Sequence, residues 1–242
     1  MNNIKVILWD IDGTLLNFHE AEKAAIRKCF EIYNLGACTD EMLKDYSIIN
    51  RGYWERLERG EVTKIEVLEG RFRDFFAKYG LDVSLAPEVN AQYQVRLGDT
   101  IVFYANGFET VTALKGRIPQ YAVTNGTKVA QDRKLKNSDL INILDGVFIS
   151  EEVGIEKPGV GFFDKIFEVI GVGSDDEVFQ GTKRYKKSEV LIIGDSLTSD
   201  IQGGNNADIL TCWFNPDKKK IDTDLRIDYE IDNLNQVLDI IL

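Results

Sequence analysis

The chain has 242 residues, 44% of them hydrophobic, enough to bury the core of one large α/β domain or of a domain with a smaller insert. Its 40 acidic and 29 basic residues give a net charge of -11, which disfavours binding to nucleic-acid polymers and anionic membrane surfaces. Three cysteines without metal-type spacing, no secretory leader and no apolar run of ~18 residues indicate a soluble cytoplasmic protein.

The N-terminal segment is an apolar strand followed by two carboxylates. Residues 6–9, VILW, are apolar throughout, and Asp10 and Asp12 follow them before a Gly-Thr turn. Residues i and i+2 of an extended segment point to the same side, so both carboxylates are expected to face one ligand. Charges at the end of a buried strand are costly without a partner, so the rest of the chain is expected to supply one.

The next region has a different character. Residues 18–97 carry long amphipathic helical patterns bounded by glycines, with no convincing buried strand. Because the first strand needs later strands to form a sheet, we predict a discontinuous core of residues 1–17 and 98–242, with a helical cap domain (18–97) inserted. The chain has a single histidine, His19, which excludes histidine-rich metal sites. His19 lies near the start of this insert and is expected to be an exposed helical residue.

The rest of the chain alternates apolar runs with helical patterns. The runs are YAVTNG (121–126), GVFIS (146–150), VLIIGDS (190–196), LTCWFN (210–215) and, more weakly, DYEI (228–231). Runs that are apolar throughout are typical of parallel strands covered on both faces, so the fold class is α/β with a doubly wound, Rossmann-like parallel sheet. The polar stretches 173–189 and 215–222 are expected to be solvated loops or a short hairpin.

Four polar clusters are expected at or beyond the carboxyl ends of these strands. They are DIDGT (10–14), Thr124-Asn125-Gly126, Lys157-Pro158, and GDSLTSD (194–200) with Asp195 and Asp200. In a doubly wound sheet such ends line one crevice. Converging carboxylates repel one another unless a divalent cation lies between them, and Mg²⁺ suits oxygen ligands. Each cluster alone also has a structural explanation: TNG as a turn, KPG as a loop and GDS as a helix N-cap.

These residue types fit phosphoryl transfer. Asp10, ionised at neutral pH, can attack phosphorus without an activating base. Asp12, if held protonated, can protonate the departing alkoxide and later accept a proton from the hydrolytic water. Thr124, Asn125 and neighbouring amides offer hydrogen bonds to phosphoryl oxygens, and Lys157 offers a positive charge.

The four clusters in this order resemble the motifs of the haloacid dehalogenase-like hydrolase superfamily, over essentially the whole chain, and the insert resembles that family's cap of the first type. The resemblance implies Asp10 as nucleophile and Asp12 as general acid/base, with Thr124 and Lys157 binding phosphate. It also implies Mg²⁺ held by Asp10, the Asp12 carbonyl and Asp195, and Asp200 orienting the metal waters or Lys157. The family usually carries a proline near the helix before the TNG strand, where this chain has Asn106, so a different loop shape is expected.

Several functions remain open at this level. Dehalogenases of the superfamily lack an acid/base two residues after the nucleophile, so Asp12 favours a phosphatase or a phosphomutase. A sugar-phosphate phosphatase or a phosphomutase is one alternative, and a binding or regulatory module that has lost catalysis is another. The intact set of Asp10, Asp12, Lys157 and Asp195 argues against the second.

Further stretches resemble bacterial pyrimidine 5′-nucleotidases that also act on noncanonical nucleotides. They are residues 50–64 and 69–72 in the cap, 149–158, and 211–215. This resemblance implies a nucleoside monophosphate as the small-molecule partner, hydrolysed to nucleoside and phosphate. Candidate cap residues for reading the base are Arg51, Tyr53, Trp54 and Arg71, by stacking or by bonding its carbonyls. The competing interpretation is that cap aromatics such as Phe72, Phe75 and Phe76 form the cap's own core.

Overall fold

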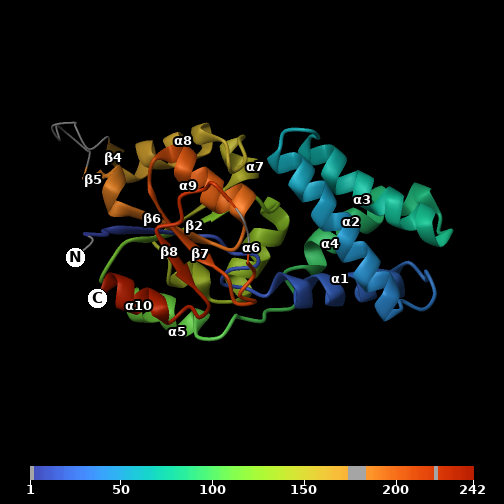
Figure 1. Cartoon of the computed structure of the whole chain (residues 1–242). Helices are drawn as coiled ribbons and strands as arrows, with labels where there is room; N and C mark the ends of the chain where they lie inside the picture. The colour runs from blue at the N-terminus through green and yellow to red at the C-terminus, as the bar shows by residue number, and fades with distance from the viewer. Residues whose placement is uncertain (1–2, 174–183, 221–222) are drawn as a thin grey trace. The chain divides into compact units, whose positions relative to one another are not determined.

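A six-stranded parallel sheet forms the centre of one part of the molecule (Figure 1). The structure, a computed structural model, describes residues 3–173, 184–220 and 223–242. The strands are β1 (Val6–Trp9), β2 (Gln120–Thr124), β3 (Gly146–Ile149), β6 (Val190–Gly194), β7 (Leu210–Phe214) and β8 (Tyr229–Ile231). Their order is β3-β2-β1-β6-β7-β8, and every neighbouring pair is parallel. The predicted doubly wound sheet is confirmed.

The strands are buried because their residues are apolar on both faces. All four residues of β1 and all five of β6 are buried. One face of the sheet packs on α8 (Val160–Ile170), whose Phe162, Phe163 and Ile166 join Val6 and Ile192 in one hydrophobic cluster. Figure 1 shows α8 and α9 (Gln202–Ala207) on this side, and α5 (Gly107–Leu114) and α10 (Gln236–Ile241) on the other. Helices on both faces explain why the strands do not alternate.

Shorter elements lie in both parts of the described chain. They are α6 (Lys128–Asn137), α7 (Ser150–Val153), a π-helical turn at Leu197–Ile201, and a pair of two-residue parallel strands, β4 (Val172–Gly173) and β5 (Tyr185–Lys186). Three 3₁₀ turns lie at Val83–Leu85, Leu140–Asn142 and Lys187–Glu189. Most of the predicted 173–189 loop lies outside the described residues. Asn106 precedes α5 with a left-handed φ of 62°, a conformation that proline, fixed near -65°, cannot adopt.

The chain divides into two compact units. The core unit comprises Met1–Asn17, Phe103–Lys128 and Ser138–Leu242, and the helical unit comprises Phe18–Val102 with Val129–Asn137. The observed boundary lies near residue 102 where the sequence suggested 97, and most of α6 groups with the helical unit. Among the described helices, none is long and apolar enough to cross a membrane.

The helical unit has its own aromatic core. Its helices are α1 (Phe18–Ile32), α2 (Asp40–Glu58), α3 (Lys64–Tyr79) and α4 (Ala86–Arg96). Helix α3 starts after Thr63, whose hydroxyl accepts from the Glu66 amide in a capping box, and ends at Gly80 with φ 64°. Three phenylalanines of α3 are fully buried in the core cluster of this unit: Phe72, Phe75 and Phe76. The structural interpretation of these aromatics is therefore correct.

Candidate active site

Adjacent strands of the core unit bring the predicted polar residues together. Asp10 follows β1, Thr124 ends β2 and Asp195 follows β6, and β1 lies between β2 and β6 in the sheet. Sheet order reverses at β1, and in doubly wound folds ligands bind at the carboxyl ends of strands beside such a reversal. The fold thus gathers side chains that are 71 to 185 residues apart in sequence.

Lys157 forms the centre of the cluster. Its side chain is 1% exposed, and its Nζ lies 2.8 Å from Asp10 Oδ1, 2.6 Å from Asp200 Oδ1 and 2.8 Å from the Val123 carbonyl oxygen. Three acceptors therefore satisfy the three N–H groups of the ammonium. The peptide bond between Lys157 and Pro158 is cis. The position of Lys157 is thus fixed by hydrogen bonds in three directions.

Thr14 links two of the carboxylates, a role for which the sequence analysis gave no prediction. Its hydroxyl oxygen lies 3.0 Å from Asp10 Oδ2 and 3.2 Å from Asp195 Oδ1, and it accepts a hydrogen bond of 3.1 Å from the Asp195 amide. The feature of the sequence that points to this role is the position of Thr14 in DIDGT, directly after Gly13. Thr14 holds the ends of β1 and β6 at a fixed separation.

Two glycines make room for carboxylates. Gly13 has a φ of 99°, and a Cβ at this position would lie 2.6 Å from the carboxylate oxygens of Asp195. A Cβ on Gly194 would likewise collide with the Asp200 carboxylate. Gly13 forms the turn expected from the sequence, and the lack of a side chain there lets Asp195 approach the end of β1.

Asn125 and Thr124 are engaged by neighbouring loops. The Asn125 amide nitrogen donates to the Lys157 carbonyl at 2.8 Å and to Ser199 Oγ at 3.3 Å, and its oxygen accepts from the Lys157 amide at 2.8 Å. The Asn125 side chain therefore holds the Lys157 loop. Phosphate binding by Asn125 stays a prediction. The Thr124 hydroxyl accepts from the Gly126 amide at 3.1 Å, and its role towards phosphate also stays a prediction.

Asp200 has both carboxylate oxygens bonded within the protein. Oδ1 accepts from Lys157, and Oδ2 accepts from the Ser196 amide at 3.1 Å. Of the two roles implied for Asp200, this geometry favours orientation of Lys157. Asp12 is partly exposed and forms a β-bridge with Leu16, and its acid/base role stays a prediction.

Burial and mutual repulsion shift the proton affinities of the cluster. Burial raises the pKa of Asp10 to about 7, against the lowering effect of Lys157. Loss of hydration within the cluster, followed by the charges of Asp10 and Asp200, raises the pKa of Asp195, although the residue as a whole is exposed. Burial lowers the pKa of Lys157, but the two carboxylates more than reverse this and raise it above its usual value.

The cluster has the composition of a divalent-cation site. Asp10, Asp195 and Asp200 each offer a carboxylate oxygen, and these atoms lie within 4.8 Å of one another. The three aspartates carry three negative charges and Lys157 carries one positive charge, which leaves a net charge of -2 when all four groups are ionised. Burial first, and repulsion between the carboxylates after it, raises the pKa values of Asp10 and Asp195. One hard divalent cation would neutralise the charge of -2. The donor set therefore fits Mg²⁺. The assignment of Asp10 and Asp195 as its ligands stays a prediction.

The four cap residues lie in the helical unit with different surroundings. Arg71 is 1% exposed, its two terminal nitrogens donate to Asn50 and Asn90 at 2.7 and 2.9 Å, and its guanidinium lies 5.0 Å from the centre of the Tyr93 ring. Arg71 is thus part of the unit's interior, which weakens the expectation that it binds a base.

The other three are more accessible. Tyr53 donates its hydroxyl to Asp74 at 2.8 Å and packs closely over Gly70, where a Cβ would overlap its ring. Trp54 is half-buried and Arg51 is exposed. Contact of these side chains with a base stays a prediction.

Comparisons with known proteins agree with this geometry. The family model of the haloacid dehalogenase-like hydrolases matches residues 4–208. HAD-hydrolase YfnB of Bacillus subtilis is 33% identical over 241 residues, covering 100% of this chain and 97% of that protein. Its magnesium-bound crystal structure superposes with a TM-score of 0.88 over 99% of both chains. The chain therefore belongs to the haloacid dehalogenase-like hydrolase family and is an enzyme of the hydrolase class.

Other relatives have named substrates. Pyrimidine 5′-nucleotidase PynA of Streptococcus pneumoniae is 33% identical over 239 residues, covering 97% of this chain and 94% of that protein. Glyceraldehyde 3-phosphate phosphatase of Methanopyrus kandleri is 26% identical over 253 residues, covering 98% and 97%. Both relatives span nearly the whole chain.

Proposed function

We propose that this protein is a Mg²⁺-dependent phosphomonoester hydrolase that acts on pyrimidine nucleoside 5′-monophosphates through an aspartyl-phosphate intermediate. The observation that carries the proposal is the joint placement of Asp10 with Lys157 and Thr14, one partner on each carboxylate oxygen. This arrangement fixes the direction of the Asp10 carboxylate. It supports the proposal because a cation beside the nucleophile would offset the charge of an incoming phosphoryl group. Nucleophilic attack requires such preorganisation.

The chemistry balances with two carboxylates. A carboxylate oxygen of Asp10 forms a bond to phosphorus as the bond to the ester oxygen breaks, and Asp12 gives its proton to that leaving oxygen. Water then attacks the phosphorus of the aspartyl phosphate and loses a proton to Asp12. The Asp10–phosphorus bond breaks, and inorganic phosphate leaves. Lys157 offsets negative charge on the phosphoryl oxygens during both steps.

The carboxylates of Asp10 and Asp195, with the Asp12 carbonyl, would hold the Mg²⁺. When bound, the cation supplies Lewis-acid polarisation of the phosphoryl group and offsets its charge. Thr14 keeps Asp10 and Asp195 at a constant separation, and Asp200 keeps Lys157 in place. A dianionic substrate is thereby accommodated in a protein of net charge -11.

The substrate class rests on the relative PynA and on the cap sequence. The core motifs grip only the phosphoryl group, so selection of the leaving group must come from other residues. Exposed Arg51 and half-buried Trp54 of α2 offer a cation and a flat ring for a pyrimidine. The second candidate function is a sugar-phosphate phosphatase, favoured by the full-length similarity to glyceraldehyde 3-phosphate phosphatase.

A phosphate-release assay with Mg²⁺ and no bisphosphate activator tests the proposal. It compares kcat/KM for UMP, dUMP and dTMP with kcat/KM for AMP, glucose 1-phosphate, glycerol phosphate and glyceraldehyde 3-phosphate. A pyrimidine nucleotide is expected to rank first. A sugar phosphate preferred about tenfold, or 1.4 kcal/mol in barrier terms, would overturn the nucleotidase proposal and leave the phosphatase standing.

Two arginine variants test base recognition within the same assay. Arg51→Ala should raise KM for UMP several-fold with a smaller effect on p-nitrophenyl phosphate. Arg73→Ala is the matched control, because Arg73 is also exposed on a helix of this unit and pairs with Glu69. Equal effects of both variants would argue against a specific role for Arg51.

A further inference from the structure

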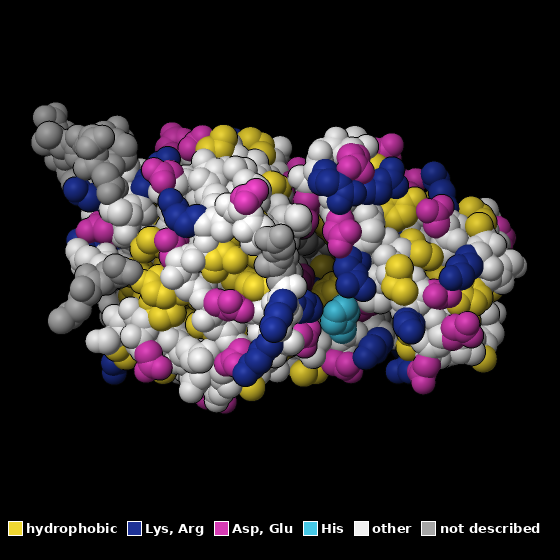
Figure 2. Space-filling model, in the orientation of Figure 1, with side chains coloured by type: hydrophobic (Ala, Val, Ile, Leu, Met, Phe, Trp, Pro, Cys, Tyr) yellow, Lys and Arg dark blue, Asp and Glu magenta, His cyan; other side chains and the backbone are white. Residues whose placement is uncertain are grey.

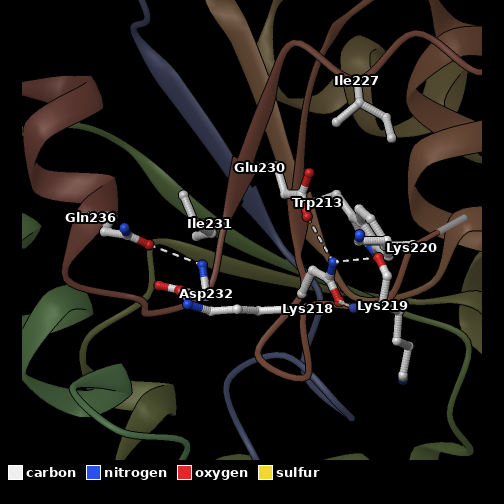
Figure 3. A pocket seen from close by; sticks show the side chains of 10 residues that line it. Trp213, Lys218, Lys219, Lys220, Ile227, Glu230, Ile231, Asp232 and Gln236 are labelled. Atoms are coloured by element: carbon white, nitrogen blue, oxygen red, sulfur yellow. Dashed lines mark hydrogen bonds and ion pairs between the residues drawn. The ribbon is translucent and has the colours of Figure 1, made fainter.

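A cavity lies in the core unit, at the carboxyl ends of β7 and β8 (Figure 3). Its volume is about 630 Å³, within the range of small-molecule sites. Its walls include Trp213 of β7, Glu230 of β8, and Asp232, which directly follows β8. They also include three consecutive lysines: Lys218, Lys219 and Lys220. None of these residues belongs to the catalytic cluster.

A buried asparagine shapes the loop that carries the lysines. Asn215 is 2% exposed, and its amide nitrogen donates to the Lys219 carbonyl at 3.0 Å and to Glu230 at 2.7 Å, while its oxygen accepts from the Lys219 amide at 2.9 Å. Lys218 takes a left-handed φ of 53°, which is uncommon for a lysine. The loop is therefore a defined turn anchored on the sheet edge.

The cavity wall concentrates lysines in a chain whose net charge is -11. Three lysines line it with two carboxylates, Glu230 and Asp232, and Asp217 beside Lys219 balances the remaining positive charge. On the face shown in Figure 2, acidic and basic side chains are interspersed, without one continuous acidic patch. A run of three lysines on one cavity wall is thus a distinct local feature.

These lysines are free to exchange partners. Lys218 pairs with Asp232 at 2.8 Å and Lys219 with Asp217 at 3.2 Å, but both lysine side chains are well exposed, and exposed pairs contribute little free energy. Within the described ranges, Lys220 forms no ion pair. An incoming dianion could therefore draw the ammonium groups together at a small cost.

The cavity also adjoins the catalytic loop. Trp213 pairs with Gly194 across β7 and β6, and its indole N–H donates to the backbone carbonyl of Asp195 at 3.0 Å. One side chain thus both lines the cavity and holds the loop that carries a metal-site carboxylate.

We infer that the β7–β8 cavity is a second anion site, separate from the catalytic cluster, that binds a phosphate group through Lys218, Lys219 and Lys220. The group is either free inorganic phosphate or the phosphate of an ester of nucleotide size, for which the volume suffices. Lysine ammonium groups bind phosphate as point charges and tolerate several orientations of the anion.

Calorimetric titration of inorganic phosphate into the full-length protein, with metal removed by EDTA, tests this inference. Without a cation, the carboxylates of the catalytic cluster repel phosphate, so the binding that remains should belong to the lysine cavity. The double variant Lys218→Ala/Lys220→Ala should weaken that binding at least about tenfold. The control Lys136→Ala, which removes an exposed lysine of α6, should leave it unchanged.

The two sources of phosphate are separated by a parallel titration with UMP. Tighter binding of UMP than of phosphate identifies an ester as the ligand, and equal binding identifies the free anion. Absence of phosphate binding, or binding that survives in the double variant, would overturn the inference. An equal loss in Lys136→Ala would also overturn it, because total charge alone would then explain the affinity. These outcomes do not depend on which phosphomonoester the enzyme hydrolyses.

Discussion

The ammonium of Lys157 lies 2.8 Å from a carboxylate oxygen of Asp10 although the two residues are 147 positions apart in the chain. Both side chains are buried, and Asp200 contacts the same ammonium. In the metal-free protein this lysine is thus the counter-ion of the proposed nucleophile, and the same group is positioned to meet a phosphoryl oxygen. We therefore expect both stability and catalysis to depend on it.

Replacement of Lys157 should damage both properties. Lys157→Ala leaves two buried carboxylates without their cation, which typically costs about 3–5 kcal/mol of unfolding free energy. Loss of one preorganised charge should lower kcat by about two to three orders of magnitude. Urea unfolding and phosphate release measure the two effects. Lys165→Ala, at an exposed lysine of α8, is the control, and comparable kcat values for the two variants would contradict the assignment.

Substitution of Gly13 should separate steric from conformational effects. Gly13→Ala places a methyl group 2.6 Å from the Asp195 carboxylate and also strains a φ of 99°. Gly36→Ala is a matched control, because Gly36 has a φ of 87° with nothing within 4 Å of a Cβ. Both variants should lose about 1 kcal/mol of stability from backbone strain. Only Gly13→Ala should also lose Mg²⁺ affinity and turnover, and equal turnover in the two would contradict this account.

The pH dependence of stability should respond to Mg²⁺. Because burial raises the pKa of Asp10 from 3.8 to about 7, the metal-free folded state retains this proton to higher pH than the unfolded state. Its contribution to the unfolding free energy is present below about pH 4 and is lost as the pH rises through about 7. We expect the difference between wild type and Asp10→Asn, measured by thermal unfolding in EDTA, to follow this fall.

Bound Mg²⁺ should reverse that trend. The cation favours the ionised carboxylate, so added Mg²⁺ should raise Tm more at pH 8 than at pH 5. EDTA should abolish hydrolysis, and Mg²⁺ should restore it. Undiminished hydrolysis in EDTA, or a Tm increase that is independent of pH, would show that the carboxylate cluster does not hold the metal.

Trp213 should act as a positioning residue for Asp195. Trp213→Phe keeps an aromatic ring but removes the indole donor to the Asp195 carbonyl, a hydrogen bond worth about 1 kcal/mol. The Mg²⁺ concentration for half-maximal activity should rise roughly fivefold, while kcat at saturating Mg²⁺ should change less. Mg²⁺ titrations of activity test this, and a loss of kcat with unchanged Mg²⁺ dependence would contradict it.

The sheet and its polar ends were predictable because they depend on local patterns. Continuous apolar runs such as VLIIG specified buried parallel strands, and Asp10 and Asp195 directly follow such runs. A helix N-cap at GDS was one interpretation of the sequence, and Ser196 does cap the turn at Leu197–Ile201. The bounds of that turn and of helix α9 were not predicted, because their sequence, LTSDIQGGNNA, is polar and glycine-rich. The two-residue strands β4 and β5 are too short to leave a periodic signal.

Side-chain roles set by distant contacts were harder to predict. Asn125 reads as a turn residue, and only its bonds to the loop 32 residues later reveal that it holds Lys157. Arg71 was a candidate for binding a base, yet its terminal nitrogens donate to Asn50 and Asn90 inside the helical unit. Tertiary hydrogen bonding of this kind leaves no mark on hydrophobic periodicity.

Detection of a covalent phosphoenzyme tests the central claim most directly. The enzyme, mixed with UMP and Mg²⁺, is quenched in acid within a fraction of one turnover, digested and analysed by mass spectrometry. We predict that the peptide containing Asp10 gains the mass of one HPO₃ group, and that Asp10→Asn shows no such gain and retains less than about a tenth of the wild-type kcat, a loss of more than 1.4 kcal/mol. An unmodified Asp10 peptide during rapid turnover, or near-normal hydrolysis by Asp10→Asn, would contradict the account.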